Sequence, residues 1–207
     1  MKVASFYAPR FDQWHCDYAD LLLSVQASCD ALGLEHVVIS DRQIGRFDCA
    51  IFDLSPNLMH ALLDGQRQYL ETQDGPVLLI GADCLVCRDP RGECPADMAI
   101  TIGPFSDCEM NTGAIWCASG RRAAPVWTEA LKAMPSEWGQ DQTALYAAVN
   151  ASSLSITRHA CETHNWAPEH VQDRCGPPVV AHFRGPRKGF MHAWAFHHLG
   201  LSVQRAA

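Results

Sequence analysis

The segment Val77-Leu78-Leu79-Ile80-Gly81-Ala82-Asp83 decides the fold. Its first four residues are all apolar, which is typical of a central strand that is covered on both faces of a sheet. Asp83 follows just beyond the carboxyl end of this strand, where open α/β sheets bind their ligands. The segment therefore predicts a buried strand that leads directly into a functional loop.

Strand and helix patterns alternate on both sides of this segment. We expect strands over residues 2–7, 37–39, 49–54, 77–80, 98–102, 114–118 and 179–183, and helices over residues 18–32, 56–70, 126–134, 142–149 and 191–199. In the second helix, Ser55 is the expected N-cap and Pro56 the first helical residue. This alternation predicts an α/β fold with a largely parallel central sheet flanked by helices. We find no convincing linker, so a single domain over residues 1–207 is expected.

Composition and charge restrict the classes of function. Hydrophobic residues make up 48% of the chain, enough for one core, and the longest apolar run is far too short to span a bilayer. The N-terminus has no apolar stretch typical of a signal peptide, so we expect a cytoplasmic protein. The net charge of −7 argues against tight non-specific binding of nucleic acid, although Arg184, Arg187 and Lys188 form a local basic patch.

Ten cysteines leave two zinc-site hypotheses open. The first uses the CxxC pair Cys84 and Cys87 together with cysteines downstream. Strand alternation would point these two thiols to opposite faces, so buried and reduced thiols are the preferred interpretation. The second hypothesis combines Cys161, His164 and Cys175, but ordinary surface or core histidines are the preferred explanation.

Three further segments place polar residues near the ends of predicted elements. They are Asn111-Thr112-Gly113, Asp141-Gln142, and the run that contains His182, Gly185 and Lys188. A neutral imidazole is a good metal ligand, a glycine lets the backbone approach a phosphate, and a lysine neutralises one. The third segment is therefore suited to a diphosphate with a metal ion. Taken singly, the first segment is also explained by a turn and the second by a helix N-cap.

In this order, the four segments resemble the retaining glycosyltransferases of the glycogenin and lipopolysaccharide galactosyltransferase group. That group has Asp-x-Asp after a buried strand, then Asn-Ser-Gly, an Asp-Gln pair and His-x-x-Gly-x-x-Lys. The resemblance runs from the first predicted strand to Lys188 and implies a single Rossmann-like domain of the GT-A type. One position departs from the pattern, because Gly81 stands where the group has the first aspartate. The implied consequence is a metal that is weakened, shifted or absent.

The resemblance also implies roles for particular residues. Asp83 and His182 would hold Mn²⁺ or Mg²⁺, ions that suit carboxylate and phosphate oxygens. The implied contacts with the nucleotide-sugar are Phe6, Tyr7, Ala8, Ala82, Asp83, Gly185 and Lys188, with Tyr7 a candidate to stack on uracil. The implied catalytic residues, near the donor sugar, are Asn111, Asp141 and Gln142.

The implied activity is transfer of a sugar, with retention, from a nucleoside-diphosphate sugar such as a UDP-sugar to a hydroxyl. The acceptor would be a saccharide, a lipid-linked molecule or a small molecule. Trp14, Trp166 and Trp194 could line an acceptor groove, with packing in the core as the preferred interpretation. Two alternatives are a phage-type enzyme that modifies hydroxymethylated bases in DNA, which the acidic charge disfavours, and a sugar-nucleotide-binding protein with little turnover, which Gly81 favours.

Overall fold

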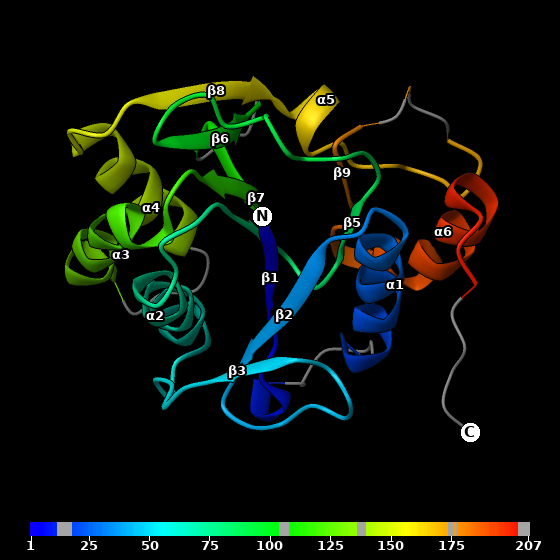
Figure 1. Cartoon of the computed structure of the whole chain (residues 1–207), viewed down its shortest axis with the longest axis horizontal. Helices are drawn as coiled ribbons and strands as arrows, with labels where there is room; N and C mark the ends of the chain where they lie inside the picture. The colour runs from blue at the N-terminus through cyan, green and yellow to red at the C-terminus, as the bar shows by residue number, and fades with distance from the viewer. Residues whose placement is uncertain (12–17, 104–107, 136–139, 174–175, 177, 203–207) are drawn as a thin grey trace.

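The computed structural model describes residues 1–11, 18–103, 108–135, 140–173, 176 and 178–202. Within these ranges, seven strands form one central sheet in the order β3-β2-β1-β4-β7-β6-β8 (Figure 1). Their bounds are β1 Lys2–Phe6, β2 Glu35–Ser40, β3 Cys49–Ile51, β4 Val77–Ile80, β6 Met98–Ile102, β7 Met110–Cys117 and β8 Ile156–Ala160. β7 runs antiparallel to its neighbours β4 and β6, and the other pairs are parallel. The expected, largely parallel α/β sheet is confirmed.

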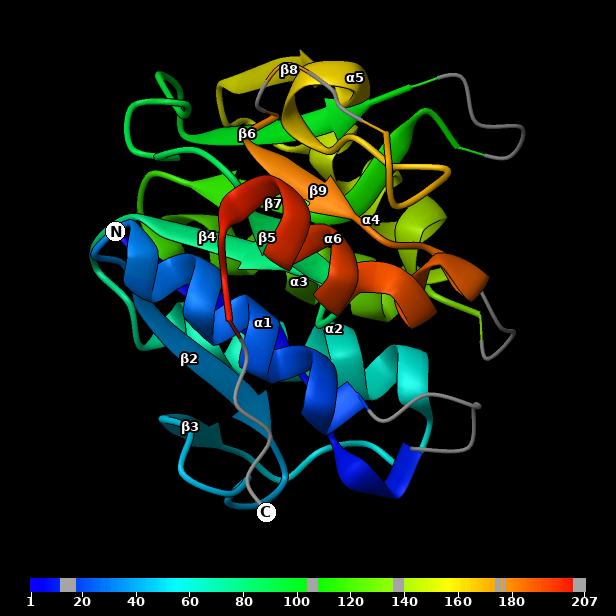
Figure 2. The same cartoon turned by 90° about the vertical axis from the view of Figure 1, so that its right-hand side faces the viewer.

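Helices cover both faces of this sheet, as Figures 1 and 2 show from two directions. The helices of one face are α2 Leu58–Glu71, α3 Gly120–Ala133 and α4 Gln140–Ala151. The other face carries α1 Tyr18–Ala31, α6 Met191–Leu199 and a small antiparallel sheet of β5 Cys84–Val86 and β9 Val180–His182. The remaining helical segments are η1 Pro9–Phe11, α5 Cys161–His164 and η2 Gly185–Phe190.

β4 lies at the centre of the core, as its uninterrupted apolar run predicts. Val77 and Leu79 pack into the cluster beneath α2, α3 and α4, whereas Leu78 and Ile80 pack into the cluster beneath α1 and α6. All four side chains are buried. Burial of apolar surface stabilises a fold by roughly 25 cal/mol per Å², so β4 contributes through the side chains on both of its faces.

Several element boundaries differ from the sequence-based expectation; for example, the helix expected over residues 126–134 begins at Gly120. α2 begins at Leu58 rather than Pro56, because the Oδ1 of Asn57 accepts hydrogen bonds from the main-chain N–H groups of Met59 and His60 at 3.0 and 3.2 Å. The predicted third strand, 49–54, ends at residue 51. A turn at residues 82–83 separates β4 from β5, which begins at Cys84.

Two further differences bear on the site. The strand expected over residues 114–118 begins at Met110, so Asn111-Thr112-Gly113 lies within β7 rather than in a turn before it. A register shift between Ile100 and Thr101 of β6 accompanies this longer pairing. β8 and α5 were not expected, because a partly exposed edge strand and a single helical turn carry no clear apolar periodicity. Among the described residues, no helix is long and apolar enough to cross a membrane.

Candidate active site

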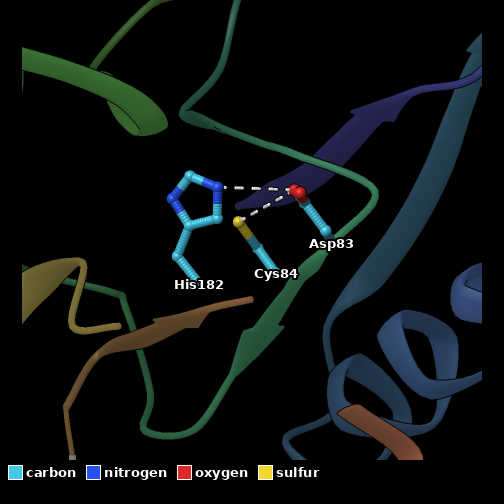
Figure 3. Close-up of side chains that lie close together, drawn as sticks. All are labelled: Asp83, Cys84 and His182. Carbon is cyan, nitrogen blue, oxygen red and sulfur yellow. Dashed lines mark hydrogen bonds and ion pairs between the residues drawn. The ribbon is translucent and has the colours of Figure 1, made fainter. Parts of the chain in front are cut away.

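Asp83 and His182 are brought together by the pairing of β5 with β9. Cys84 of β5 lies opposite His182 of β9, and the main-chain N–H of Phe183 donates to the carbonyl oxygen of Asp83 at 2.8 Å. The Nε2 of His182 lies 3.5 Å from the Oδ1 of Asp83. In Figure 3 both side chains point toward each other, with the Cys84 thiol between them and 4.0 Å from the same carboxylate oxygen. The expected convergence of these two segments is therefore present.

Lys188 completes this constellation from the next element. Its Nζ lies 2.8 Å from the Oδ2 of Asp83, and both side chains are largely buried. Burial alone would raise the pKa of Asp83, but the adjacent His182 and Lys188 hold it well below its usual range. Burial would lower the pKa of Lys188, and the Asp83 carboxylate raises it instead. The site thus holds a carboxylate and an ammonium in their charged forms.

The backbone of the segment that carries Lys188 depends on Gly185. This glycine has a φ of +57°, in the left-handed region that residues with a Cβ rarely adopt, and it begins η2. The turn brings Lys188 back over α1, where its Nζ lies 5.6 Å from the centre of the Tyr18 ring. Tyr18 is a site residue that the sequence analysis did not identify, because its place in the apolar pattern of α1 predicts a core residue.

Gly81 has a specific steric consequence. A Cβ at this position would stand 2.5 Å from the Oδ1 of Asp83 and 3.3 Å from the Sγ of Cys84. The carboxylate of Asp83 therefore occupies the space that a side chain at residue 81 would need. The glycine at residue 81 and the present orientation of Asp83 are two parts of one arrangement.

Asn111 and Gly113 reach the site because β7 is antiparallel. Its beginning meets the carboxyl end of β4, with Ala114 opposite Ile80. A Cβ at Gly113 would collide with the His182 imidazole, so the ring packs directly on the glycine backbone. The Oδ1 of Asn111 accepts hydrogen bonds from the Gly113 N–H at 2.8 Å and from the Nδ2 of Asn165 at 2.6 Å. Asn165 was not identified from the sequence, since an isolated asparagine carries no spacing signal.

Asp141 and Gln142 lie in the first turn of α4. The Oε1 of Gln142 accepts a hydrogen bond from the main-chain N–H of Thr112 at 3.2 Å, which joins α4 to the Asn111–Gly113 segment. Asp141 is buried, and burial raises the pKa of its carboxyl group. The structure therefore connects Gln142 with the segment that supports His182.

The residues expected to contact the nucleotide base lie at the end of β1. Tyr7 is buried and packs in the same cluster as Ala82, which directly precedes Asp83. Ala8 is buried in a neighbouring cluster, against which Phe6 packs. Trp194 is also buried, and its ring centre lies 6.1 Å from that of Trp166, whereas Trp14 lies outside the described residues.

Of the two zinc hypotheses, only the one that uses Cys84 and Cys87 falls entirely on described residues. Cys84 directs its thiol to the carbonyl oxygen of Gly113 at 3.3 Å, and the thiol of Cys87 lies 3.6 Å from the carbonyl oxygen of Leu85. No metal-binding group within the described ranges contains both cysteines. In the second hypothesis, Cys175 lies outside the described residues. The described groups with metal-ligand geometry are Asp83, Cys84 and His182, and separately Glu93, His159 and His164.

No protein-family model matches the sequence, and no curated protein matches it in sequence. Solved structures are similar in fold. A glycosyltransferase involved in glycosylation of the major capsid of PBCV-1 has a TM-score of 0.57 and 13% identity, over 92% of this chain and 98% of its own. The galactosyltransferase LgtC with donor and acceptor sugar analogs has a TM-score of 0.57 and 12% identity, over 99% of this chain and 98% of its own. An active-site mutant of LgtC has a TM-score of 0.53 and 13% identity, over 90% of this chain and 88% of its own. These likenesses show that the chain has the GT-A fold.

Proposed function

We propose that this protein is a glycosyltransferase that moves a sugar from a nucleoside-diphosphate sugar, a UDP-sugar by preference, to an acceptor hydroxyl with retention. The observation that carries the proposal is the meeting of Asp83, His182 and Lys188 at the carboxyl end of β4. In an open α/β sheet this is the edge where ligands bind. The fold is one that known glycosyltransferases share.

Lys188 has the central role in this proposal. Displacement of a nucleoside diphosphate from an anomeric carbon leaves negative charge on the departing oxygens. A positioned ammonium stabilises such charge in the transition state, and this kind of electrostatic effect is usually the largest in catalysis. Without donor, Asp83 neutralises Lys188 at 2.8 Å. A bound diphosphate would compete with Asp83 for the ammonium, and the N–H groups around Gly185 would approach the same phosphates.

The side chains of Asp83 and His182 are suited to binding a divalent cation. Asp83 and His182 each offer a ligand atom, these atoms lie within 4.8 Å of each other, and the side chains are largely buried. These two residues would hold Mn²⁺ or Mg²⁺ together with diphosphate oxygens, and the ion would add positive charge at the leaving group. Because a single carboxylate takes part, we expect weak binding of the metal unless the nucleotide is also present.

The remaining residues are proposed to position the donor. Tyr7 and Ala82, which pack together, would form the base side of the site with Phe6 and Ala8. Asp141 and Gln142 would face the donor sugar. The carboxamide oxygen of Asn111 already accepts two hydrogen bonds, so we assign Asn111 to holding Gly113 beneath the His182 ring. Saccharide, lipid-linked and small-molecule acceptors, and a cytoplasmic location, remain part of the proposal.

A sugar-nucleotide-binding protein with little turnover is the second candidate function. It is favoured by Gly81, because the carboxylate that relatives would offer at this position is replaced by the turned-in Asp83. Both candidate functions predict that the protein binds a nucleotide-sugar, but only the glycosyltransferase is expected to transfer the sugar. Release of UDP from a UDP-sugar, measured with and without acceptor, therefore separates them.

The test begins with a panel of nucleotide sugars and free nucleoside diphosphates in a thermal-shift assay, since a ligand that binds only the native state raises stability. The donor that gives the largest shift is then used for turnover with saccharide, lipid-linked and hydroxymethylated-DNA acceptors. Turnover that is lost in Lys188→Ala but retained in Lys132→Ala, an exposed lysine of α3, supports the proposal. Failure of every nucleotide and sugar nucleotide to bind would overturn both candidates.

A further inference from the structure

A second cluster of metal-binding side chains lies apart from Asp83. Glu93 comes from the loop between β5 and β6, His159 from β8 and His164 from α5. One ligand atom from each lies within 4.8 Å of the other two. The Nε2 of His164 is 3.1 Å from the Oε2 of Glu93, and the Nε2 of His159 is 2.7 Å from the main-chain oxygen of Glu93. Two parts of the chain that are distant in sequence, one with Glu93 and the other with His159 and His164, thus present nitrogen and oxygen ligands to one point.

The hydroxyl of Thr163 supports the ring of His164 from the side away from Glu93. The Nδ1 of His164 lies 2.8 Å from this hydroxyl, which donates to the carbonyl oxygen of Ala160 at 3.2 Å. With a metal ion on Nε2, the Nδ1–H would donate to the hydroxyl. A hydrogen bond on the nitrogen that does not bind the ion commonly orients a metal-binding histidine.

Other side chains pack around the cluster. Arg88 donates to the second carboxylate oxygen of Glu93 at 2.8 Å, which leaves Oε2 directed at the histidines. The rings of His159 and His164 are stacked, with centres 3.8 Å apart, and both lie edge-on to the buried Trp116. The side chains of Glu93 and His164 are 20% and 14% exposed, so solvent reaches the cluster only in part.

We propose that Glu93, His159 and His164 form a zinc site. Two imidazoles and a carboxylate suit Zn²⁺, which prefers four ligands in a tetrahedron. A water molecule or the main-chain oxygen of Glu93 would take the fourth position. On binding, His159 would give up its hydrogen bond to that oxygen, and its ring would turn out of the stack with His164, because two parallel rings cannot both direct a nitrogen lone pair at one ion. The site extends beyond the proposed sugar transfer and uses none of its residues.

The position of the cluster gives the metal a structural role. Asn165, which directly follows His164, donates to Asn111 at 2.6 Å, and Trp166 bonds through its backbone to β9, whose last residue is His182. A zinc ion would fasten the loop between β5 and β6 to β8 and α5. It would thereby stabilise the segment that lies beneath the candidate active site.

The experiment is a titration of the purified, metal-free protein with Co²⁺ and then Zn²⁺, in a reductant without thiol groups. We expect one tetrahedral Co²⁺ with visible absorption bands, displaced by Zn²⁺, and a rise in Tm on adding Zn²⁺. Glu93→Gln and His164→Asn should each weaken binding more than about tenfold and abolish the rise in Tm. His197→Asn, an exposed histidine of α6, is the matched control, and His182→Asn tests the other cluster.

Three results would overturn the assignment. One is unchanged affinity in both Glu93→Gln and His164→Asn. Another is a loss confined to His182→Asn, which would place the ion beside Asp83. The third is a thiolate-to-cobalt charge-transfer band, which would show that cysteine binds the metal. If either variant fails to fold by circular dichroism, His159→Asn replaces it, and the charge-transfer criterion still applies to the unmodified chain.

Discussion

Asp83 takes part in more interactions of the candidate site than any other residue described above. It faces the ammonium of Lys188, the imidazole of His182 and the thiol of Cys84. His182 and Lys188 hold the pKa of the Asp83 carboxyl group low, and the carboxylate raises the pKa of Lys188. A ligand that enters this site must therefore exchange one of these contacts. Single substitutions around Asp83 are accordingly the sharpest tests of its role.

Lys188→Ala is expected to weaken binding of a nucleoside diphosphate by about 1.5–3 kcal/mol, the range of a hydrogen bond to a charged group. The variant removes one charged partner of the largely buried Asp83, so circular dichroism must show a native fold before the affinities are compared. Calorimetry with UDP measures the effect. The exposed Lys132→Ala should bind UDP like the unmodified protein. Equal affinity in the two variants would mean that Lys188 only pairs with Asp83 and does not bind the diphosphate.

Gly81→Ala is expected to destabilise the protein by about 1–3 kcal/mol, as overpacked substitutions do. The new methyl group would stand 2.5 Å from the Oδ1 of Asp83, which would have to turn away from His182. Gly75→Ala is the matched control, because nothing lies within 4 Å of a Cβ there. Denaturant unfolding of both variants measures the difference. Similar stabilities would mean that the Asp83 side chain moves aside freely.

At the scale of the elements, the sequence predicts what apolar periodicity and chain order determine. β4 and α6 were predicted with their observed bounds, because one has an uninterrupted apolar run and the other a clear helical pattern. The bounds of these two elements follow from features that neighbouring residues encode locally. The meeting of Asp83 with His182 was expected from the resemblance to a glycosyltransferase group, and the pairing of β5 with β9 outside the central sheet brings it about.

Other features depend on contacts between distant segments and were missed. β7 extends back to Met110 only because β6 pairs with it past a register shift. β8 is an edge strand without an apolar face, so its sequence resembles a loop. The helix start at Asn57 was misplaced because Ser55-Pro56 offered an equally good local signal, and the side chain of Asn57 makes the cap. The cluster of Glu93, His159 and His164 has no shared sequence motif.

His36 connects three elements and should give the fold a pH dependence. Its ring nitrogens lie 2.9 Å from the Ser5 hydroxyl of β1 and 3.0 Å from the Gln26 carboxamide of α1. Burial lowers the pKa of His36 to about 4. An unfolded histidine binds its proton near pH 6.5, so between that pH and about 4 the unfolded state holds more protons. The free energy of unfolding should therefore fall by roughly 3 kcal/mol as the pH drops through this window.

Urea unfolding at several pH values between 7 and 4.5 measures this slope. His36→Gln should be less stable at pH 7 and lose most of the dependence. His164, whose pKa burial also lowers, contributes with the same sign, so the slope should flatten rather than vanish. His170→Gln, at an exposed position, is the control and should keep the full slope. The assignment to His36 fails if both variants retain equal slopes.

At the scale of the whole molecule, charge decides how a metal ion can bind. The chain carries a net charge of −7, yet at the candidate site Lys188 neutralises Asp83 at 2.8 Å. Affinity for a hard divalent cation depends on the charge and number of its ligands. The free protein therefore offers a poor site despite its acidic composition. A nucleoside diphosphate would change this balance, because it supplies anionic oxygens and draws Lys188 toward itself.

We therefore expect Mn²⁺ to bind at least about tenfold more tightly when UDP is present than when it is absent, because the diphosphate adds charged oxygen ligands. The titration is best performed in His164→Asn, so that the Glu93 cluster does not contribute. Asp83→Ala should lose the enhancement, whereas Asp74→Ala, an exposed aspartate 80% accessible to solvent, should keep it. Tight binding without UDP would contradict the charge argument. Full turnover in the presence of a chelator, with no Mn²⁺ binding in either condition, would instead mean that Lys188 and the backbone around Gly185 stabilise the leaving group without a metal.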